Sequence, residues 1–559
     1  MKKLLLYTTL IGTLFAAACN SSAGADEAED SGNEDAARTS KKISRRDVSI
    51  TRENAYTDLF LDSNAVVQYI AENKVSDSVA RRITSFYNAR NYQFAWFATD
   101  GLTEQARGFW NLLDYTVEHR GDTTLRDKAL LKRMNALTSE EKLRFAAGDK
   151  NALQTELKLT DHFIRYMTQY YADGQVKRKE MERFVPRKKE EALYLADSLL
   201  NKKHKDNKYY EDVNTAYAAL KKELARYTDI VKKGGWPTVS GPLKGLKPGD
   251  STAVVKVLKQ RLALSGDMAP GDTTALFNDA LLAGIRNFQE RMGYTPTDQL
   301  TEQQLKDLNV PATVRLQQLL MNMERMRWMP VAEESGNLIV ANIPEFVLHV
   351  YEGKQKAFDM NIVVGKEGSS TMMFNGDLNQ VVFSPYWNVP PSIVRDEILP
   401  KLASNPGYLD GQNMEQVGND EGGLPRIRQR PGPDNSLGRV KFLFPNSFNI
   451  YFHDTNAKSL FSKDKRAYSH GCIRLEEPEK MAQYLLRNDP SWTPDRIEEA
   501  MNSGTEKYVR LKKPVPVVIT YYTAWVDERG RLNFRDDIYG HDRDLAGKMF
   551  AGNAQTAKR

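Results

Sequence analysis

The chain has 559 residues, and its formal net charge of +6 corresponds to a pI near 8.8. Because a single hydrophobic core rarely grows beyond about 250 to 300 residues, this length predicts several domains. The mild positive charge suits an environment of acidic polymers, but no nucleic-acid-binding motif accompanies it, so we expect no nucleic-acid partner.

The N-terminal residues have the pattern of a secretory signal. Met1-Lys2-Lys3 precedes an apolar run over residues 4–18 that is too short to span a bilayer. The stretch Ala16-Ala17-Ala18-Cys19 resembles a bacterial lipoprotein cleavage site, which implies that residues 1–18 are a lipoprotein signal peptide and that Cys19 is lipidated. Cleavage near Ala18 by an ordinary signal peptidase is the alternative. The lipoprotein interpretation implies a periplasmic protein with a lipid anchor in a cell-envelope membrane.

Residues 19–53 follow as a predicted disordered tether. Most of this segment is rich in Ser, Gly, Ala and acidic residues and has almost no large apolar residues. Such a composition cannot bury enough apolar surface to offset the entropy of ordering the chain.

Residues 54–234 carry apolar side chains at helical spacing. Examples are Ala192, Leu195 and Leu199, followed by Tyr217, Leu220 and Leu224. This spacing predicts an all-helical scaffold domain. We interpret its dense aromatic residues, such as Phe109-Trp110, as core rather than as a surface on which a ligand stacks.

Residues 235–312 form a smaller predicted unit behind a Gly- and Pro-rich linker. One expected helix has Val254, Leu258 and Leu262 on one face, and a second aligns Leu281, Ile285, Phe288 and Met292. With Leu246-Lys247-Pro248-Gly249-Asp250 before the first helix, this pattern resembles the small three-helix peptidoglycan-binding domain, which implies glycan as a partner. A purely architectural insert is the alternative.

A connecting helix is expected within residues 313–337, and residues 338–526 then change to β-rich runs such as 358–364. An insertion rich in Gly, Asn and Arg occupies about 391–438. Residues 515–526 read as one strand, and a turn and a returning strand begin the C-terminal segment, residues 527–559.

Cys472 lies in the strongest chemical motif, Ser469-His470-Gly471-Cys472, and His453 lies upstream of it. A neighbouring imidazole converts a thiol to the nucleophilic thiolate. Glycine before the cysteine permits a sharp turn, so that main-chain N–H groups around Gly471 and Cys472 can point at a developing oxyanion. We therefore predict an acyl-transfer site. The alternatives are a zinc site of His453, His470 and Cys472, or a buried cysteine that acts as a small hydrophobe.

The spacing of His453, fifteen residues and then Ser469-His470-Gly471-Cys472 resembles the signature of the L,D-transpeptidase family. These cysteine enzymes cross-link or trim peptidoglycan stem peptides. Arg474 stands where smaller members have asparagine, which is typical of the large periplasmic branch. The resemblance extends to the stretches 324–328, 342–344, 387–393 and 431–438.

The resemblance implies a multidomain α+β fold. Its parts would be the helical scaffold, the peptidoglycan-binding-like unit and a mostly β catalytic domain over residues 338–526. The insertion at 391–438 would be a mobile lid that covers the cleft, and residues 527–559 would pack back on the scaffold.

The resemblance also implies roles for individual residues. Cys472 would be the nucleophile, His453 the general base and acid, and His470 a supporting residue, with the backbone of Gly471 at the oxyanion. In this family a main-chain carbonyl orients the base, which leaves Asp454 as a neighbour. The residues expected to bind substrate are Ser469, Arg474, Tyr451 and Trp387. For two of them a structural role is the alternative, because Arg474 could brace its loop and Trp387 could be core.

The implied function is a peptidoglycan L,D-transpeptidase that forms 3-3 cross-links through an acyl-enzyme on Cys472. Its partners would be stem peptides and glycan, and it would need no metal or organic cofactor. An L,D-carboxypeptidase or an amidase for wall-linked proteins would use the same residues. A non-catalytic lipoprotein that anchors the membrane to peptidoglycan is the alternative from a different class.

Overall fold

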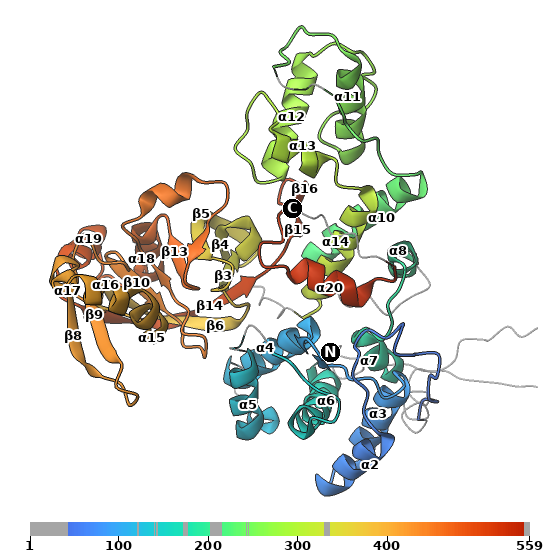
Figure 1. Cartoon of the computed structure of the whole chain (residues 1–559), viewed down its shortest axis with the longest axis horizontal. Helices are drawn as coiled ribbons and strands as arrows, with labels where there is room; N and C mark the ends of the chain where they lie inside the picture. The colour runs from blue at the N-terminus through green and yellow to red at the C-terminus, as the bar shows by residue number, and fades with distance from the viewer. Residues whose placement is uncertain are drawn as a thin grey trace, which may run out of the picture. The chain divides into compact units, whose positions relative to one another are not determined.

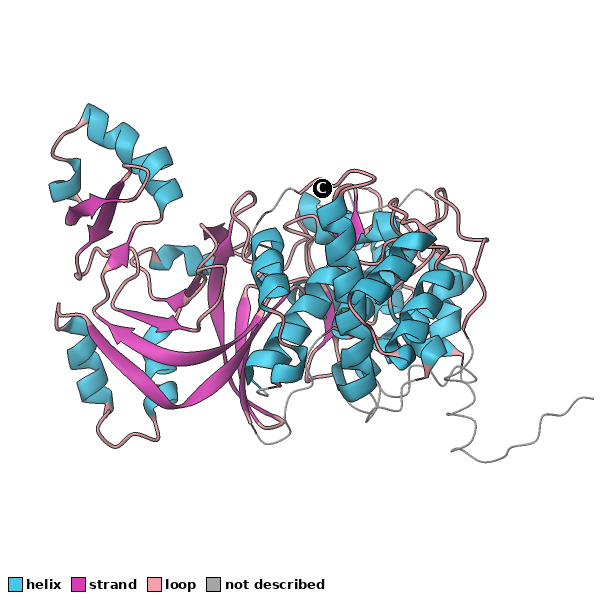
Figure 2. Cartoon of the chain, turned by 90° about the horizontal axis from the view of Figure 1, so that it is seen from below, coloured by secondary structure: helices cyan, strands magenta, loops and turns pink. Residues whose placement is uncertain are grey.

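The computed structural model describes residues 43–552, apart from 120–121, 139, 141–142, 171–176, 202–214, 242, 244 and 329–335. The predicted signal peptide, Cys19 and the tether up to residue 42 lie outside the described residues. The multidomain α+β prediction is confirmed, because helices precede and follow a mostly β domain that carries an inserted cap (Figures 1 and 2).

The helical part contains one large hydrophobic core. Its elements are α2 (Ser63–Glu72), α3 (Asp77–Asn88), β1 (Phe97–Ala98), β2 (Gly101–Leu102), α4 (Glu104–His119), η1 (Thr123–Leu125), α5 (Lys128–Thr138), α6 (Lys150–Tyr170), α7 (Arg178–Phe184), α8 (Ala192–Leu200) and α10 (Thr215–Lys232). Trp96 is fully buried, and its ring packs 5.5 Å from that of Phe109 and 5.4 Å from that of Phe163, measured between centroids. The aromatic residues are therefore core, as predicted.

Residues 43–53 are ordered, although their composition had assigned them to the disordered tether. The Ser44 hydroxyl donates to Glu182 at 2.7 Å, and the Asp47 amide donates to the Asn88 carbonyl at 2.9 Å. Ile50 is fully buried. These contacts with α3 and α7 are made across the fold, so local composition does not reveal them.

The small unit has three helices, α11 (Ala253–Ser265), α12 (Asp279–Arg291) and α13 (Glu302–Leu308). The faces that the spacing predicted for the first two helices are buried. Arg291 of α12 forms a buried bidentate ion pair with Asp267, with N–O distances of 2.7 and 2.6 Å.

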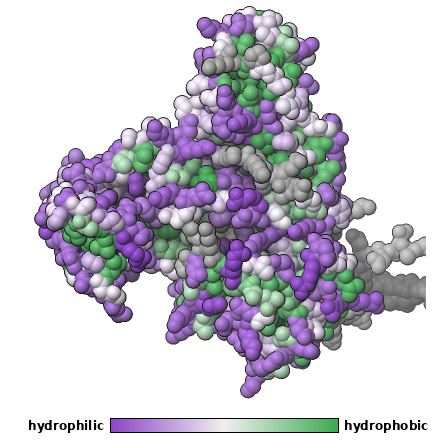
Figure 3. Space-filling view, viewed as in Figure 1, coloured by the Kyte–Doolittle hydropathy of each residue, from purple (hydrophilic) through white to green (hydrophobic). Residues whose placement is uncertain are grey.

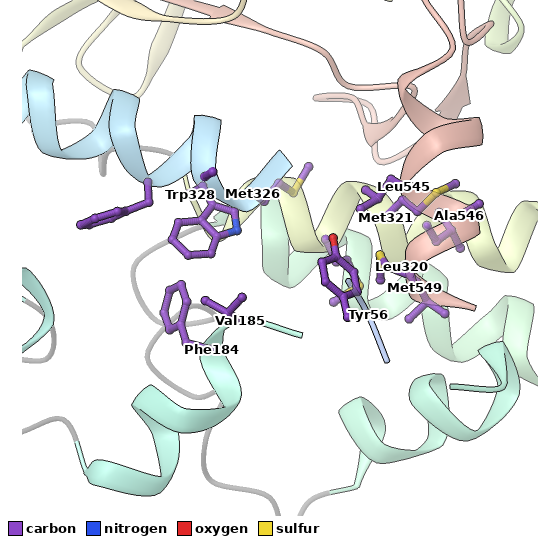
Figure 4. Close-up of a cluster of buried hydrophobic side chains, with 14 of the residues drawn as sticks. Tyr56, Phe184, Val185, Leu320, Met321, Met326, Trp328, Leu545, Ala546 and Met549 are labelled. Atoms are coloured by element: carbon purple, nitrogen blue, oxygen red, sulfur yellow. The ribbon is translucent and has the colours of Figure 1, made fainter. Parts of the chain in front are cut away.

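Helix α14 (Ala312–Met326) and the C-terminal helix α20 (His541–Met549) lie together at the centre of the helical core. Figure 4 shows Leu320 and Met321 of α14 beside Leu545 and Met549 of α20. Just beyond α14, the ring of Trp328 packs 4.8 Å from Phe184 of α7 (Figure 4). The C-terminal helix is thus part of the scaffold core.

The strand expected over residues 515–526 is broken in the structure. It divides into the end of β14 (Lys507–Thr520) and β15 (Ala524–Val526), which forms a separate hairpin with β16 (Leu532–Phe534). The break is fixed by Asn322 of α14, whose amide accepts from the Thr523 N–H at 2.9 Å and donates to the Thr523 hydroxyl at 2.8 Å. Asn322, which lies 201 residues before Thr523 in the sequence, therefore separates the hairpin from the sheet that contains β14.

The β domain is built on a nine-stranded sheet with the order β12-β5-β13-β11-β10-β6-β14-β3-β4. Its further strands are β3 (Asn337–Asn342), β4 (Val347–Glu352), β5 (Gln355–Gly365), β6 (Asn375–Phe383), β10 (Val440–Leu443), β11 (Phe452–His453), β12 (Ala467–Ser469) and β13 (Ile473–Leu475). Strand β4 also pairs with β5, so the sheet closes on itself. Two helices, α18 (Pro478–Leu486) and α19 (Pro494–Asn502), pack on its hydrophobic core.

The insertion has a small core and a sheet of its own. Its elements are β7 (Trp387–Asn388), α15 (Pro391–Ile393), η5 (Val394–Ile398), α16 (Leu399–Ser404), α17 (Tyr408–Gly411), β8 (Met414–Asn419) and β9 (Pro425–Gln429). The buried cluster that holds these elements together consists of Val389, Ile393, Val394, Ile398, Met414 and Ile427. We call residues 387–438 the cap, because β7 pairs with β9 and so belongs to this module.

The surface in Figure 3 is mostly hydrophilic, with smaller apolar areas between the charged residues. None of the helices that the structure describes is both long and apolar enough to cross a membrane.

Candidate active site

Two neighbouring strands bring the motif residues together. Strands β11 and β13 run parallel, with His453 opposite Arg474. Two residues before this pair, the same register continued past the strand ends puts Cys472 opposite Tyr451, whose carbonyl accepts the Ile473 N–H at 3.2 Å. Because side chains alternate along a strand, all four of these side chains project from one face, while Phe452 and Ile473 point into the core.

Cys472 is a half-buried thiol in the resting structure. Burial raises its pKa to about 11, against the stabilising influence of the Tyr451 hydroxyl and main chain on the thiolate. The thiol donates to the Asn449 carbonyl, with an S–O distance of 3.6 Å. The sequence led us to expect a thiolate at neutral pH. The structure instead predicts a protonated thiol, because burial outweighs the neighbouring groups.

His453 is held as a neutral base. Its Nδ1 lies 2.5 Å from the main-chain oxygen of Asp454, which can only accept, so Nδ1 carries the proton and Nε2 is the free base. Burial, reinforced by the positive charge of Arg474, lowers the pKa of His453 to about 3. No hydrogen bond joins His453 to Cys472 in the described part of the chain. The two are diagonal neighbours on adjacent strands. Catalytic hydrogen bonds in enzymes without substrate are often long and form fully only in the substrate complex.

The Asp454 carboxylate is occupied by other partners. It accepts from the Arg439 N–H at 2.8 Å, the Thr455 N–H at 2.7 Å and the Lys458 ammonium at 2.7 Å. Gly438 lies against this carboxylate with φ of +63°, and any Cβ there would collide with it. The carbonyl of Asp454 orients the base, and its carboxylate fixes the turn around that carbonyl.

The loop before Cys472 is tied down by side-chain hydroxyls. Ser469 Oγ donates to the Cys472 carbonyl at 2.5 Å and accepts from the Gly471 N–H at 3.2 Å. Thr371 Oγ1 donates to the Gly471 carbonyl at 2.7 Å. Gly471 has φ of +113°, a conformation that favours glycine. The Gly471 N–H already donates to Ser469, so among the described residues the Cys472 N–H is the amide of this peptide pair that can donate to an oxyanion. The expected role of Gly471 at the oxyanion stays a prediction.

Other predicted site residues have different positions. His470 is exposed, and its Nε2 lies 2.9 Å from a carboxylate oxygen of Glu397 of the cap. Trp387 packs against the core of the cap. Arg474 is half-buried beside the thiol, and its Nε is buried without a hydrogen-bond partner among the described residues.

The zinc interpretation does not fit these contacts. His453 directs Nδ1 to a carbonyl and His470 directs Nε2 to a carboxylate on the cap. Among the described residues, no group of three or more His, Cys, Asp or Glu side chains is arranged to hold a metal ion.

Sequence reasoning missed Glu397 and Tyr539 and gave Thr371 no role in the site. Glu397 lies 73 residues before its partner in the motif, and Tyr539 lies 168 residues after Thr371, to which its hydroxyl is hydrogen-bonded.

Comparisons with known proteins show which families the two main parts of the chain resemble. Residues 336–519 match the family model of the L,D-transpeptidase catalytic domain, and residues 81–224 match a scaffold domain. A curated protein of Haemophilus influenzae that carries a provisional L,D-transpeptidase name is 32% identical over 244 residues, which are 41% of this chain and 49% of that protein. The chain thus spans about half the length of this relative. Residues 336–519 are thus the part of the chain that is similar to the L,D-transpeptidase catalytic domain.

Three solved L,D-transpeptidases are also similar to the chain. The enzyme of Mycobacterium smegmatis is 16% identical and covers 33% of this chain and 59% of its own, with a TM-score of 0.19. The enzyme of Stackebrandtia nassauensis is 13% identical, and the match covers 50% of this chain and 97% of that enzyme, with a TM-score of 0.22. A third enzyme, solved in complex with imipenem, is 13% identical, and the match covers 33% of this chain and 59% of that enzyme, with a TM-score of 0.18. At these scores the solved structures add nothing to the assignment.

Proposed function

We propose that the chain is a peptidoglycan L,D-transpeptidase that joins stem peptides through an acyl-enzyme on Cys472. The observation that carries this proposal is the arrangement on β11 and β13, where a carbonyl-oriented neutral His453 and the Cys472 thiol share one face. The match of residues 336–519 to the catalytic-domain family supports it.

The first half-reaction forms a thioester. As Cys472 Sγ attacks the carbonyl between the third and fourth residues of a tetrapeptide stem, its proton moves to His453 Nε2. The oxyanion that develops is stabilised by the free Cys472 N–H. When the intermediate collapses, the C–N bond breaks, and His453 returns the proton to the leaving amine, which departs with the terminal D-amino acid.

The second half-reaction transfers the acyl group. A side-chain amine on the third residue of another stem attacks the thioester carbonyl and gives a proton to His453. Collapse breaks the C–S bond, and the thiolate recovers that proton. The product is a 3-3 cross-link. Water in place of the amine yields a tripeptide, which is the L,D-carboxypeptidase alternative with the same residues.

Arg474 is proposed to bind a substrate carboxylate. Its guanidinium lies beside the thiol, its Nε is buried without a partner, and the five donors of an arginine suit bidentate recognition of a carboxylate. Peptidoglycan stems carry carboxylates close to the scissile bond, so the charge of Arg474 matches this substrate class.

The product of the reaction tests the proposal. The purified protein and its Cys472→Ala variant are incubated with disaccharide-tetrapeptide, and the products are identified by mass spectrometry. Dimers linked between third residues, absent with the variant, support the transpeptidase. Tripeptide monomers alone support the carboxypeptidase, and unchanged substrate supports the non-catalytic anchoring protein.

A lipid anchor on Cys19 and a periplasmic location are part of the proposal. They rest on the Ala16-Ala17-Ala18-Cys19 pattern, which lies outside the described residues. Metabolic labelling with a fatty-acid probe tests them: we expect label in the native chain and none in Cys19→Ser. Label retained by Cys19→Ser contradicts the anchor.

Glycan binding by the small unit is likewise proposed from its sequence pattern. The unit lies near the catalytic domain, because the Thr295 hydroxyl donates to Asp464 at 2.8 Å. Co-sedimentation of the Cys472→Ala variant with insoluble peptidoglycan, with and without surface substitutions on α12, tests the binding. Equal sedimentation of both forms contradicts a glycan site on that helix.

A further inference from the structure

A turn over residues 365–371 lies behind the loop that carries the nucleophile. The Lys366 N–H donates to the Ser469 carbonyl at 2.9 Å, and Thr371 Oγ1 donates to the Gly471 carbonyl at 2.7 Å. Thr371 is almost fully buried. The turn therefore forms hydrogen bonds to two carbonyls of the motif loop, those of Ser469 and Gly471, which flank His470.

The bond from Thr371 to Gly471 sets the direction of the oxyanion donor. A trans peptide is planar, so its C=O and its N–H point in opposite directions. Once the Gly471 carbonyl is held by Thr371, the N–H of Cys472, which belongs to the same peptide, is aimed away from Thr371. Within the part of the chain that the structure describes, no acceptor meets this N–H, so it is free for a substrate oxygen.

Tyr539 from the C-terminal segment closes this turn. Its hydroxyl donates to the Gly365 carbonyl at 2.6 Å and accepts from the Thr371 N–H at 3.2 Å, so one oxygen bridges both ends of the turn. The turn is tightly packed, because a Cβ on Gly365 would collide with the Ser369 carbonyl and the Thr371 nitrogen. The Gly365 N–H also donates to Thr371 Oγ1 at 2.9 Å, so loss of the Tyr539 hydroxyl removes one of two hydrogen-bonded links between the ends of the turn and loosens the Thr371 backbone.

Tyr539 is in turn fixed by its own surroundings. Its ring stacks on Tyr521 with centroids 5.7 Å apart, and its N–H donates to the Tyr521 hydroxyl at 2.9 Å. The Tyr521 hydroxyl donates to Asp537 at 2.8 Å. Two residues after Tyr539, helix α20 begins and enters the scaffold core.

We propose that Tyr539 is a positioning residue of the active site, which acts through Thr371 and Gly471 to aim the Cys472 amide at the oxyanion. The C-terminal segment would then couple the scaffold core to the catalytic loop. This inference rests on the proposed acyl transfer at Cys472.

Two reactions of the same thiol separate positioning from general damage. Acylation of Cys472 by imipenem passes through an oxyanion at a carbonyl, whereas alkylation by iodoacetamide displaces iodide at a CH₂ group and forms no oxyanion. Removal of a direct oxyanion donor costs about 10²–10³ in rate, and misdirection of one should cost less. For Tyr539→Phe, which keeps the ring, we expect acylation to slow at least tenfold and alkylation to stay within twofold of the native rate.

Matched variants of Thr371 test the proposed path. Thr371→Val removes the hydroxyl that donates to the Gly471 carbonyl and accepts the Gly365 N–H, and it should repeat the effect of Tyr539→Phe. Thr371→Ser keeps both hydrogen bonds and should keep most of the acylation rate. The double variant Tyr539→Phe, Thr371→Val should be little slower than either single variant, because both act on one peptide. Thermal unfolding of each variant verifies that it is folded.

Three results overturn the inference. Equal slowing of acylation and alkylation in Tyr539→Phe means that the thiol itself has been disturbed, and no slowing of either means that the hydroxyl has no part in positioning. If iodoacetamide alkylates the native protein but imipenem does not acylate it, both this inference and the proposed acyl-transfer mechanism fail. Normal acylation without any peptidoglycan product instead contradicts only the proposed substrate.

Discussion

The imidazole of His453 is held by its immediate neighbour in the chain, because Nδ1 lies 2.5 Å from the main-chain oxygen of Asp454. The adjacent carboxylate points elsewhere, to Lys458 and to two main-chain N–H groups. The pair therefore differs from a triad in which an acid side chain orients the base.

Asp454→Asn should therefore leave catalysis largely intact. We expect less than a tenfold fall in kcat, since the carbonyl that orients His453 is retained, whereas His453→Gln should lose about 10²–10⁴ as a missing general base. Steady-state rates of both variants with the tetrapeptide donor measure this. A fall for Asp454→Asn as large as that for His453→Gln would assign the carboxylate a direct part in catalysis.

The reactivity of the thiol should depend steeply on pH. Because burial raises the pKa of Cys472 to about 11, alkylation by iodoacetamide should be slow at pH 7 and rise about tenfold per pH unit toward pH 11. His453→Gln should have nearly the same profile. A plateau that begins near neutral pH, and that disappears in His453→Gln, would show a thiolate–imidazolium pair instead.

Acid should destabilise the fold through His453. Its folded pKa of about 3 lies below the ordinary value of 6.5, so the neutral ring contributes stability that is fully present above pH 6.5 and is lost as the pH falls toward 3. Chemical denaturation between pH 7 and pH 4 should show a smaller loss of unfolding free energy in His453→Gln than in the native chain. Equal losses in both contradict a buried neutral imidazole.

The cap should contribute to substrate binding through Glu397. Its carboxylate lies 2.9 Å from His470 Nε2, and an exposed contact of this kind is worth about 0.2–1 kcal/mol when the imidazole is protonated. We expect Glu397→Gln to raise KM a fewfold with kcat nearly unchanged, and the effect to weaken at high salt. Asp396 is the exposed neighbour of Glu397, and Asp396→Asn serves as the control for a change of charge on the cap. The same change in both variants would indicate a general effect of cap charge.

Gly438→Ala should damage both stability and activity. The added methyl group strains a backbone with φ of +63° and meets the Asp454 side chain, which fixes the turn after His453. We expect a loss of about 1–3 kcal/mol in unfolding free energy and a clear fall in kcat. Gly423→Ala, with φ of +82° and nothing within 4 Å of its Cβ, carries only backbone strain and should keep its activity.

Local patterns in the sequence predicted much of this fold. The apolar faces of α11 and α12 are buried where helical spacing placed them. These features depend on residues a few positions apart. The Cys472 motif was found for the same reason, because its glycine, cysteine and histidine lie within twenty residues of His453.

Contacts between distant residues could not be predicted in this way. Asn322 breaks the strand after Thr520, and Ile50 is buried although it belongs to a segment of polar composition. Tyr539 reaches the turn before Thr371 from the far end of the chain. The protonated state of Cys472 also depends on burial, which the sequence around it does not reveal.

The intact mass of the protein after brief mixing with disaccharide-tetrapeptide tests the central claim most directly. We predict a transient adduct with the mass of the donor less its terminal amino acid, which peptide mapping locates on Cys472. The adduct should be a thioester, which hydroxylamine cleaves, and Cys472→Ser should form no such thioester. Product formation with no such adduct, or at the native rate by Cys472→Ala, would contradict an acyl-enzyme on this cysteine.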